Sequence, residues 1–383
     1  MKLTLDLEQQ ELVRTARKLL STRYPLDDTA ERVRAEADPR ALLAEAVDLG
    51  WTAIPLPESH GGLGATVLDL ALVYEELGRA AVATPLDASI ALVAIPLART
   101  APRSAAFVAD LVEGRTLATL AVLEEGMRDE WARRSLTAAA SGDGWTVSGV
   151  LAMVPWGAAA DTILVVVDLE GRGPRLLSIA GGASGLATRS LRVVGGSPSA
   201  RVVLDGMHVT EADVVLDSQE EVEAFVTTAL DTAMVLGAAQ AVGACESALQ
   251  LSVTWAKDRR QFGRPIGSFQ AVSNRCADMR MGIDAARLLV LEAAWALDAE
   301  SAPPASSSVA KSYVDQVIDD VEASSHLVHG AMGFSTEYPL HLYTRMMKRF
   351  QMSWGSADSH LDRVASALDQ ARAAVVPTVR SSR

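Results

Sequence analysis

Apolar residues recur at the three- and four-residue spacing of amphipathic helices at both ends of the chain. Near the N-terminus this spacing predicts helices over 8–24 and 40–49 and through VLDLALVYEELGRA. Near the C-terminus it predicts helices over 219–257, 268–299, 307–333, 339–353 and 358–374. Long helices joined by short loops are typical of an antiparallel bundle.

The middle of the chain has a different pattern. Short β-branched runs such as DTILVVVD and ARVVLDGMHV alternate with Gly, Pro, Asp and Ser, which indicates strands. The segment SGDGW between two such runs predicts a hairpin. We therefore expect an α+β protein with an N-terminal helical domain over 1–112, a β domain of five to seven strands over 113–217 and a helical bundle over 218–383.

Composition and charge narrow the class of protein. Apolar residues make up 49% and charged residues 22% of the chain, which is typical of a globular protein. The net charge of −13 argues against a nucleic-acid surface. Cys245 and Cys276 lie inside helical patterns and are expected to be buried thiols in a reducing cytoplasm. We found no signal-peptide pattern and no uncharged apolar run of about 20 residues, so no membrane span is expected.

The segment KDRRQFGRPIGSFQAV at 257–272 carries more cationic, aromatic and amide groups than a loop between two helices needs. By themselves these residues fit either solvated loop charges with a core phenylalanine or a ligand site. His326 and His329 stand three residues apart, but no acidic or cysteine partner is positioned to complete a metal site. We therefore expect no metal.

The α, β, α order and two long segments resemble the acyl-CoA dehydrogenase family. The segments are WAKDRRQFGRPIGSFQAVSNRCADM and VHGAMGFSTEYPLHLYTRMMK, and LGWTAIPLPESHGGLGATVLDLALVYEELGRA is also similar, so the resemblance spans nearly the whole chain. It implies three domains with a C-terminal four-helix bundle, oligomers built as dimers of dimers, and FAD. It also implies that a carboxylate takes the α-proton of an acyl-CoA thioester while the β-hydrogen leaves as hydride to the flavin. Electron-transfer flavoprotein is the implied acceptor.

The family's signature loop crosses a subunit interface and grips the neighbour's FAD. The resemblance implies that the guanidinium of Arg259 contacts the FAD pyrophosphate, where a bidentate cation suits the charge. Phe262 is then expected against the cofactor and Gln270 at its polar edge. The glycine-rich turn within the second segment is where the family's backbone approaches the cofactor closely. Assigned to that turn are His329, Gly330 and Gly333.

The β domain departs from the family pattern. Met153 and Pro155 stand where the family has Trp-Ile-Thr covering the flavin ring, and proline has no N–H to donate. Both are retained as cofactor-binding positions, and Trp156 is a candidate for the stacking role. Of the family's Thr-Glu-Pro and Gly-Ser-Asp motifs, this sequence retains only Glu124 and Gly126.

The two positions from which the family supplies its catalytic glutamate hold Trp354 and Ala233, and neither can take a proton. Asp231 is two residues from Ala233, but a two-residue shift rotates a helical side chain by about 200°. Asp358 and His360 follow the other position and are expected to be a capping carboxylate and a surface histidine. The catalytic base is therefore unidentified, with Asp231 and Asp358 as weak candidates.

The positions that contact a neighbour's cofactor hold the family's residues, whereas the positions that contact the chain's own flavin and substrate hold different residues. A homotetramer needs both sets in every subunit, but a heteromer needs each set once per site. The chain thus resembles the base-lacking subunit of actinobacterial α2β2 heterotetrameric family members, including some in steroid degradation.

Two alternatives to this heteromeric subunit stay open. One is a self-sufficient homomeric flavoenzyme with an unusual base, such as Glu124, or an unusual substrate. The other is a non-catalytic structural or CoA-binding homologue.

Overall fold

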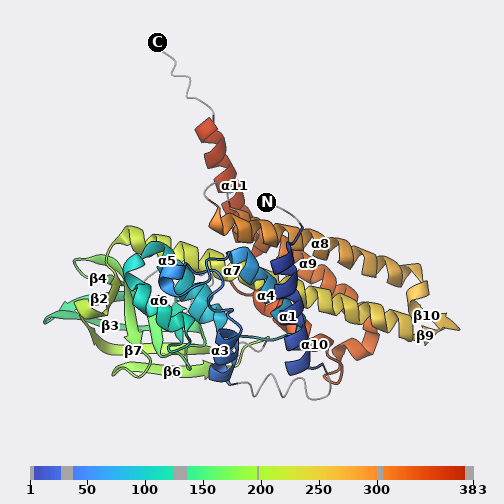
Figure 1. Cartoon of the computed structure of the whole chain (residues 1–383), viewed down its shortest axis with the longest axis horizontal. Coiled ribbons are helices and arrows are strands. Elements are labelled where there is room, and N and C mark those ends of the chain that lie inside the picture. The colour runs from blue at the N-terminus through green and yellow to red at the C-terminus, as the bar shows by residue number, and fades with distance from the viewer. Residues whose placement is uncertain are drawn as a thin grey trace, which may run out of the picture.

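The structure, a computed structural model of the whole chain, describes residues 4–26, 38–123, 136–195, 198–299, 303 and 305–375. Helices at the N-terminal end lie against the middle of the molecule, with the sheet at one end and the long helices extending to the other (Figure 1). The expected α, β, α order and the α+β class are confirmed. Glu124 and Gly126 lie outside the described residues.

The N-terminal helices begin at polar caps. Asp6 and Thr66 each accept a hydrogen bond from the backbone N–H three residues on and form capping boxes with Gln9 and Asp69. The elements are α1 (Leu7–Arg23), α3 (Pro39–Asp48), α4 (Val67–Arg79), the π-helix η2 (Asp87–Ala94), α5 (Ile95–Thr100) and α6 (Ala105–Val112).

Within the described residues one eight-stranded sheet follows, in the order β6-β7-β3-β2-β4-β5-β8 with β1 parallel to β4. The strands are β1 (Ala118–Ala121), β2 (Leu136–Ser141), β3 (Gly144–Pro155), β4 (Thr162–Leu169), β5 (Gly173–Ala180), β6 (Leu186–Leu191), β7 (Ser199–Val209) and β8 (Val214–Leu216). The SGDGW hairpin joins β2 to β3, with Gly142 at φ +64°. The expectation of five to seven strands was low, because the mostly exposed β6 and the three-residue β8 lack a long apolar run.

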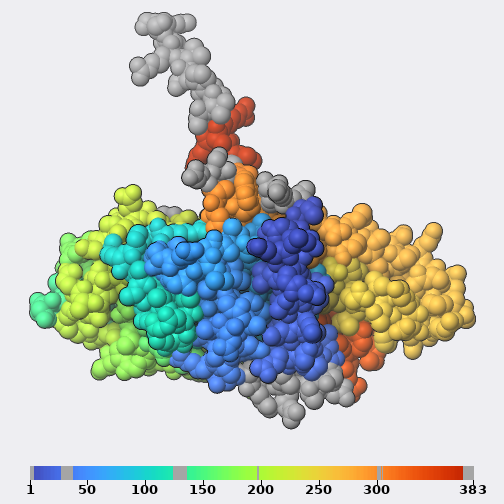
Figure 2. All heavy atoms as spheres, in the orientation of Figure 1, coloured from blue at the N-terminus to red at the C-terminus, as the bar shows by residue number. Residues whose placement is uncertain are grey.

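The C-terminal helices form the bundle around α7. They are α7 (Gln219–Asp258), α8 (Gln270–Asp298), α9 (Ser306–His329), α10 (Leu340–Gln351) and α11 (Ala357–Val375). The short hairpin of β9 (Arg260–Gln261) and β10 (Arg264–Pro265) joins α7 to α8, and the turn η7 (Gly330–Phe334) follows α9. Against expectation, α11 does not lie along the bundle but projects from the body (Figures 1 and 2).

Helix α7 is the central element of the molecule. In the described part of the chain it is the one helix long and apolar enough to cross a membrane, yet 61% of that apolar window is buried inside the protein. Glycines bring α4 against it: a Cβ at Gly78 would lie 1.9 Å from the carbonyl oxygen of Gln240, and one at Gly243 would lie 1.9 Å from that of Glu75. This close crossing positions α4 and η2 beside the site described next.

Candidate functional site

A cavity of about 600 Å³ lies where α7, α10 and η2 meet the ends of β1 and β3. Ala233 and Trp354, the two positions at which the family carries a catalytic glutamate, both line it. They are 121 residues apart in the chain (354 − 233), so only the packing of α10 against α7 brings them together. The two sequence positions therefore share one site, and at these two positions the site has a methyl group and an indole instead of a carboxylate.

Trp354 fills the space beside α7 because the facing helix residues are small. A Cβ at Gly237 would lie 3.2 Å from the Phe350 ring and 3.7 Å from Nε1 of Trp354. Trp354 has a positive φ of +66°, a region that bulky residues rarely adopt, and Gly355 follows at +86°. The turn after α10 thus directs a large aromatic side chain to the cavity wall.

His360 holds this turn from inside the protein. Its Nε2 lies 2.5 Å from the Trp354 carbonyl oxygen, and its Nδ1 lies 3.0 Å from the Ser308 hydroxyl. The side chain is fully buried, so its expected place on the surface was wrong. Asp358 is exposed in the first turn of α11 and is not among the residues that line the cavity.

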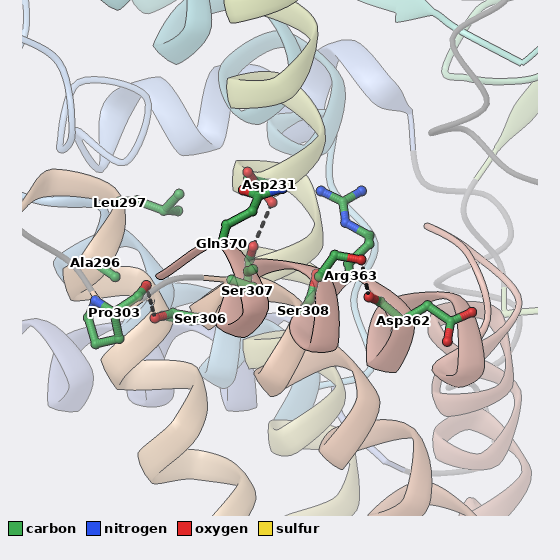
Figure 3. Close-up of a pocket in the computed structure, with 14 residues that line it drawn as sticks. Asp231, Ala296, Leu297, Pro303, Ser306, Ser307, Ser308, Asp362, Arg363 and Gln370 are labelled. Carbon is green, nitrogen blue, oxygen red and sulfur yellow. Dashed lines mark hydrogen bonds between the residues drawn. The ribbon is translucent and has the colours of Figure 1, made fainter. Parts of the chain in front are cut away.

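Asp231 points to a different part of the molecule. Its carboxylate accepts a 2.6 Å hydrogen bond from the Ser307 hydroxyl in a second pocket of about 670 Å³, which lies beside α11 (Figure 3). Burial raises the pKa of Asp231, opposed by the hydrogen bond from Ser307 and the charge of Arg363. Because the residue is not among those lining the cavity of Ala233 and Trp354, it is not placed to act there.

Met153 and Pro155, assigned to the flavin-ring side, also line the cavity. Two backbone positions offer no free donor there, because Pro155 has no N–H and the N–H of Ala152 already donates to the Leu123 carbonyl at 2.7 Å. Met153 has a φ of +53° and a side chain that is 46% exposed. Trp156 is 2% exposed and is not a lining residue, so the idea that it covers the flavin was wrong.

The signature hairpin lies at the far end of the bundle (Figure 1). Arg259, Phe262 and Gln270 are all exposed, Phe262 by 92%. Phe262 stands at φ +50° with its ring edge-on to Phe269, 6.2 Å between centroids. Arg259 is 26 residues beyond Ala233 (259 − 233), which is about 39 Å along a continuous helix. These side chains therefore cannot reach the flavin-ring side of their own cavity.

The turn at Gly330 lies at the same end as the hairpin, because the rings of His329 and Trp255 are 5.6 Å apart. Gly330 has a φ of +61° and open space beside it, whereas a Cβ at Gly333 would lie 3.0 Å from His326 Nδ1. The imidazole of His329 is buried, with Nδ1 2.8 Å from the Ser325 carbonyl oxygen and Nε2 3.1 Å from the Tyr338 hydroxyl. His329 therefore supports the turn from inside, and burial lowers its pKa.

Sequence reasoning missed a charged group in the cavity. Asp87 of η2 and Arg349 of α10 both line it, with Asp87 Oδ2 3.7 Å from Arg349 Nη1. Arg349 Nη2 also donates to Gln240 Oε1 at 2.9 Å. The sequence contained a usable signal: Asp87 is the one charged residue between Arg79 and Arg99, in an otherwise apolar run.

Family models and known proteins that match this chain are acyl-CoA dehydrogenases, the family that its sequence resembles. Residues 6–104 match the model of the acyl-CoA dehydrogenase N-terminal domain, and residues 224–368 match that of the C-terminal domain. The chain is 30% identical to the probable acyl-CoA dehydrogenase YngJ of Bacillus subtilis, covering 81% of this chain and 85% of the relative. It is 32% identical to the acyl-CoA dehydrogenase IpdE2 of Mycobacterium tuberculosis, over 82% of this chain and 80% of the relative.

Among solved structures, the chain is similar to one in the ChsE4-ChsE5 complex from Mycobacterium tuberculosis, with a TM-score of 0.85 and 27% identity over 99% of this chain and 100% of the other. The fold and the signature segments thus define a flavin-dependent dehydrogenase architecture. The chain belongs to the acyl-CoA dehydrogenase family, whose members are FAD-dependent oxidoreductases, as its sequence predicted.

Proposed function

We propose that this chain is a subunit of an acyl-CoA dehydrogenase that helps to bind FAD across a subunit interface but lacks a catalytic base of its own. The observation that carries the proposal is the meeting of Ala233 and Trp354 in one cavity. Both family positions for the glutamate face the same space, and neither residue can accept a proton at neutral pH. A homologous partner chain would supply the missing carboxylate in its own cavity.

Acyl-CoA dehydrogenation cannot proceed without a base, so the absence of a carboxylate at positions 233 and 354 matters for function. Bound FAD accepts a hydride from the β-carbon of the thioester, and an enzyme carboxylate must remove the α-proton. Among the described residues lining the cavity, Asp87 is the one carboxylate. It lies beside Arg349, which also binds Gln240, seven residues and thus about 10 Å along α7 from Ala233. Asp87 is therefore paired with a cation that is held about two helical turns along α7 from Ala233, and we infer that it is not placed as the family's base is.

The residues fit FAD on one side only. The exposed Arg259, Phe262 and Gln270 offer the cationic, aromatic and amide groups that suit a dinucleotide presented by a neighbouring chain. The ring side offers Met153 and Pro155, and neither Pro155 nor the N–H of Ala152 can donate to a ligand there. The similarity to a chain of the ChsE4-ChsE5 complex supports a pairing of two homologous chains. We further propose a cytoplasmic complex that acts on an acyl-CoA and delivers electrons to electron-transfer flavoprotein.

The test is to purify the chain alone and with a homologous acyl-CoA dehydrogenase subunit. We expect the chain alone to be poor in flavin absorbance between 300 and 550 nm and to show little acyl-CoA oxidation with an artificial electron acceptor. Co-expression should restore both properties, with light scattering reporting a heteromer. Stoichiometric FAD on a homotetramer that turns over at about 1–10³ s⁻¹, the usual enzyme range, would refute the proposal.

A further inference from the structure

The inner end of the cavity carries charge where an acyl-binding cavity has no need of it. Asp87 and Arg349 are 3.7 Å apart there, and the fully buried Tyr74 lines the same end. Arg349 donates to Gln240 through Nη2, but its buried Nε has no hydrogen-bond partner among the described residues. The guanidinium is therefore held in place while its buried Nε–H donor is unused.

Burial distinguishes this end from the rim. The side chains of Asp87 and Arg349 are 20% and 21% exposed, and Ala91 and Leu92, which follow Asp87 on η2, are each 1% exposed. At the rim, Met153 and Met352 are 46% and 74% exposed. Gln240, the partner of Arg349, lies about 10 Å along α7 from Ala233. A thioester whose reacting carbons lie beside Ala233 and Trp354 would thus extend the distal end of its acyl group toward the charged pair.

A purely aliphatic end is a poor match for this surface. It would exclude water from Arg349 Nε without replacing the lost hydrogen bond, which is costly for a charged donor. A carboxylate end would satisfy the donor but place a second negative charge beside Asp87, which already balances Arg349. An uncharged oxygen accepts from the guanidinium without adding charge, and a hydroxyl can also donate to Asp87.

We propose that Arg349 and Asp87 select an acyl group whose distal end carries an uncharged oxygen, as in a hydroxyl or a ketone. The inference rests on the proposed function only in taking the ligand to be an acyl-CoA thioester. It does not depend on which chain supplies the catalytic base, because it concerns binding and not turnover.

The experiment measures Kd by calorimetry for the full-length chain with its flavin and any partner retained. The probes are octanoyl-CoA, ω-hydroxyoctanoyl-CoA and ω-carboxyoctanoyl-CoA, which differ only at the distal end. We expect the hydroxylated probe to bind roughly tenfold to a hundredfold more tightly than octanoyl-CoA, the range for a hydrogen bond to a charged group. The carboxylated probe should bind more weakly than the hydroxylated one.

Two variants and a control tie the preference to the pair. Arg349→Met should bring the Kd values for the hydroxylated and plain probes together, whereas Arg345→Met, an exposed arginine one turn earlier on α10, should keep the wild-type ratio. Asp87→Asn leaves Arg349 uncompensated and should make the carboxylated probe the tightest binder.

Three results would overturn the inference: equal Kd values for the plain and hydroxylated probes, a wild-type preference for the carboxylate, or no binding of any probe. Because turnover is not measured, these results are separate from those that test the missing base. An active homotetramer with the hydroxyl preference would refute the proposed function and leave this inference standing.

Discussion

At the scale of single residues, the backbone departs from its usual conformations at the segments assigned to flavin and substrate. Met153, Phe262 and Trp354 all have positive φ angles, between +50° and +66°. Such conformations cost of order 1–3 kcal/mol for a non-glycine residue and persist where the surrounding structure holds them. Trp354 has an identifiable support, since His360 binds its carbonyl oxygen from the protein interior.

The arginine pair of the signature hairpin gives a residue-level prediction. Arg259→Ala should lower the FAD content of the assembled protein several-fold, because a charged contact to the pyrophosphate is lost. Arg260→Ala removes the same charge at the adjacent residue of the hairpin and should leave the FAD content near that of the wild type. Flavin absorbance per assembled complex measures both variants. Equal losses would mean that general positive charge, not Arg259, retains the cofactor.

At the scale of elements, small residues determine where helices cross. A Cβ at Gly243 of α7 would lie 1.9 Å from a backbone oxygen of α4, so no side-chain rotation relieves the clash. Gly282 of α8 has no such restriction, since its Cβ would lie 3.4 Å from Val317, an ordinary contact. The same substitution is therefore expected to act in opposite directions at the two glycines.

Gly243→Ala should lower the free energy of unfolding by about 1–3 kcal/mol or more, because it forces α4 away from α7. Gly282→Ala should raise it by up to about 1 kcal/mol, because alanine favours a helix interior. Urea unfolding followed by circular dichroism measures both. A destabilised Gly282→Ala would show that α8 is packed more tightly than its contacts indicate.

A buried lysine of α9 pairs with an aspartate of the same helix and also binds the end of α10. Lys311 is fully buried and donates to Asp315 at 2.8 Å and to the Phe350 carbonyl oxygen at 3.0 Å. Burial raises the pKa of Asp315 to about 6, although Lys311 opposes the rise. This link holds the C-terminal end of α10 just before the turn that carries Trp354.

The raised pKa of Asp315 predicts a pH dependence of stability. Between about pH 4 and 6 the folded protein holds a proton at Asp315 that the unfolded chain releases, so this group lowers the free energy of unfolding as the pH rises. The loss is up to about 3 kcal/mol for a shift of about two pKa units. Asp315→Asn should remove this slope in urea titrations, whereas Asp320→Asn, at an exposed position of α9 whose charge does not contribute to the Asp315 shift, should retain it. An unchanged slope in Asp315→Asn would assign the effect to another group.

At the scale of the whole molecule, the two groups of residues that we propose to contact flavin lie far apart along α7. The hairpin follows the C-terminal end of the helix, about 39 Å from Ala233, so the proposed site needs a second chain to be complete. Helix α11 points to the same need, because it projects from the body with Leu361 and Leu368 exposed by 48% and 57%. Leu361, Val364 and Leu368 follow the three- and four-residue spacing of a helix-packing stripe.

That stripe predicts a dependence of assembly on α11. Replacing Leu361 and Leu368 together by serine should lower the molar mass of the assembled protein in light scattering, because the apolar contact with another chain is lost. Replacing the neighbouring exposed Asp362 and Asp369 by serine is the matched control and should leave the mass unchanged. An unaltered mass in the leucine variant would show that α11 lies outside the assembly contacts.

The sequence by itself determined the order of elements, most helix ends to within a few residues, and the family. Helix 219–257 was placed almost as observed, since amphipathic spacing and caps are local properties. The signature segments identified the hairpin and the η7 turn for the same reason, because a contiguous motif needs no knowledge of distant residues. The absence of glutamate at positions 233 and 354 was also evident from the amino-acid sequence alone.

Only the tertiary structure decided what those positions share. Ala233 and Trp354 line one cavity because α10 packs on α7, and Asp87 meets Arg349 there although 262 residues separate them (349 − 87). Packing also buried His360, turned Asp231 to another pocket and left α11 projecting from the bundle. Local periodicity cannot supply these facts, since they depend on which helix faces meet after long loops close.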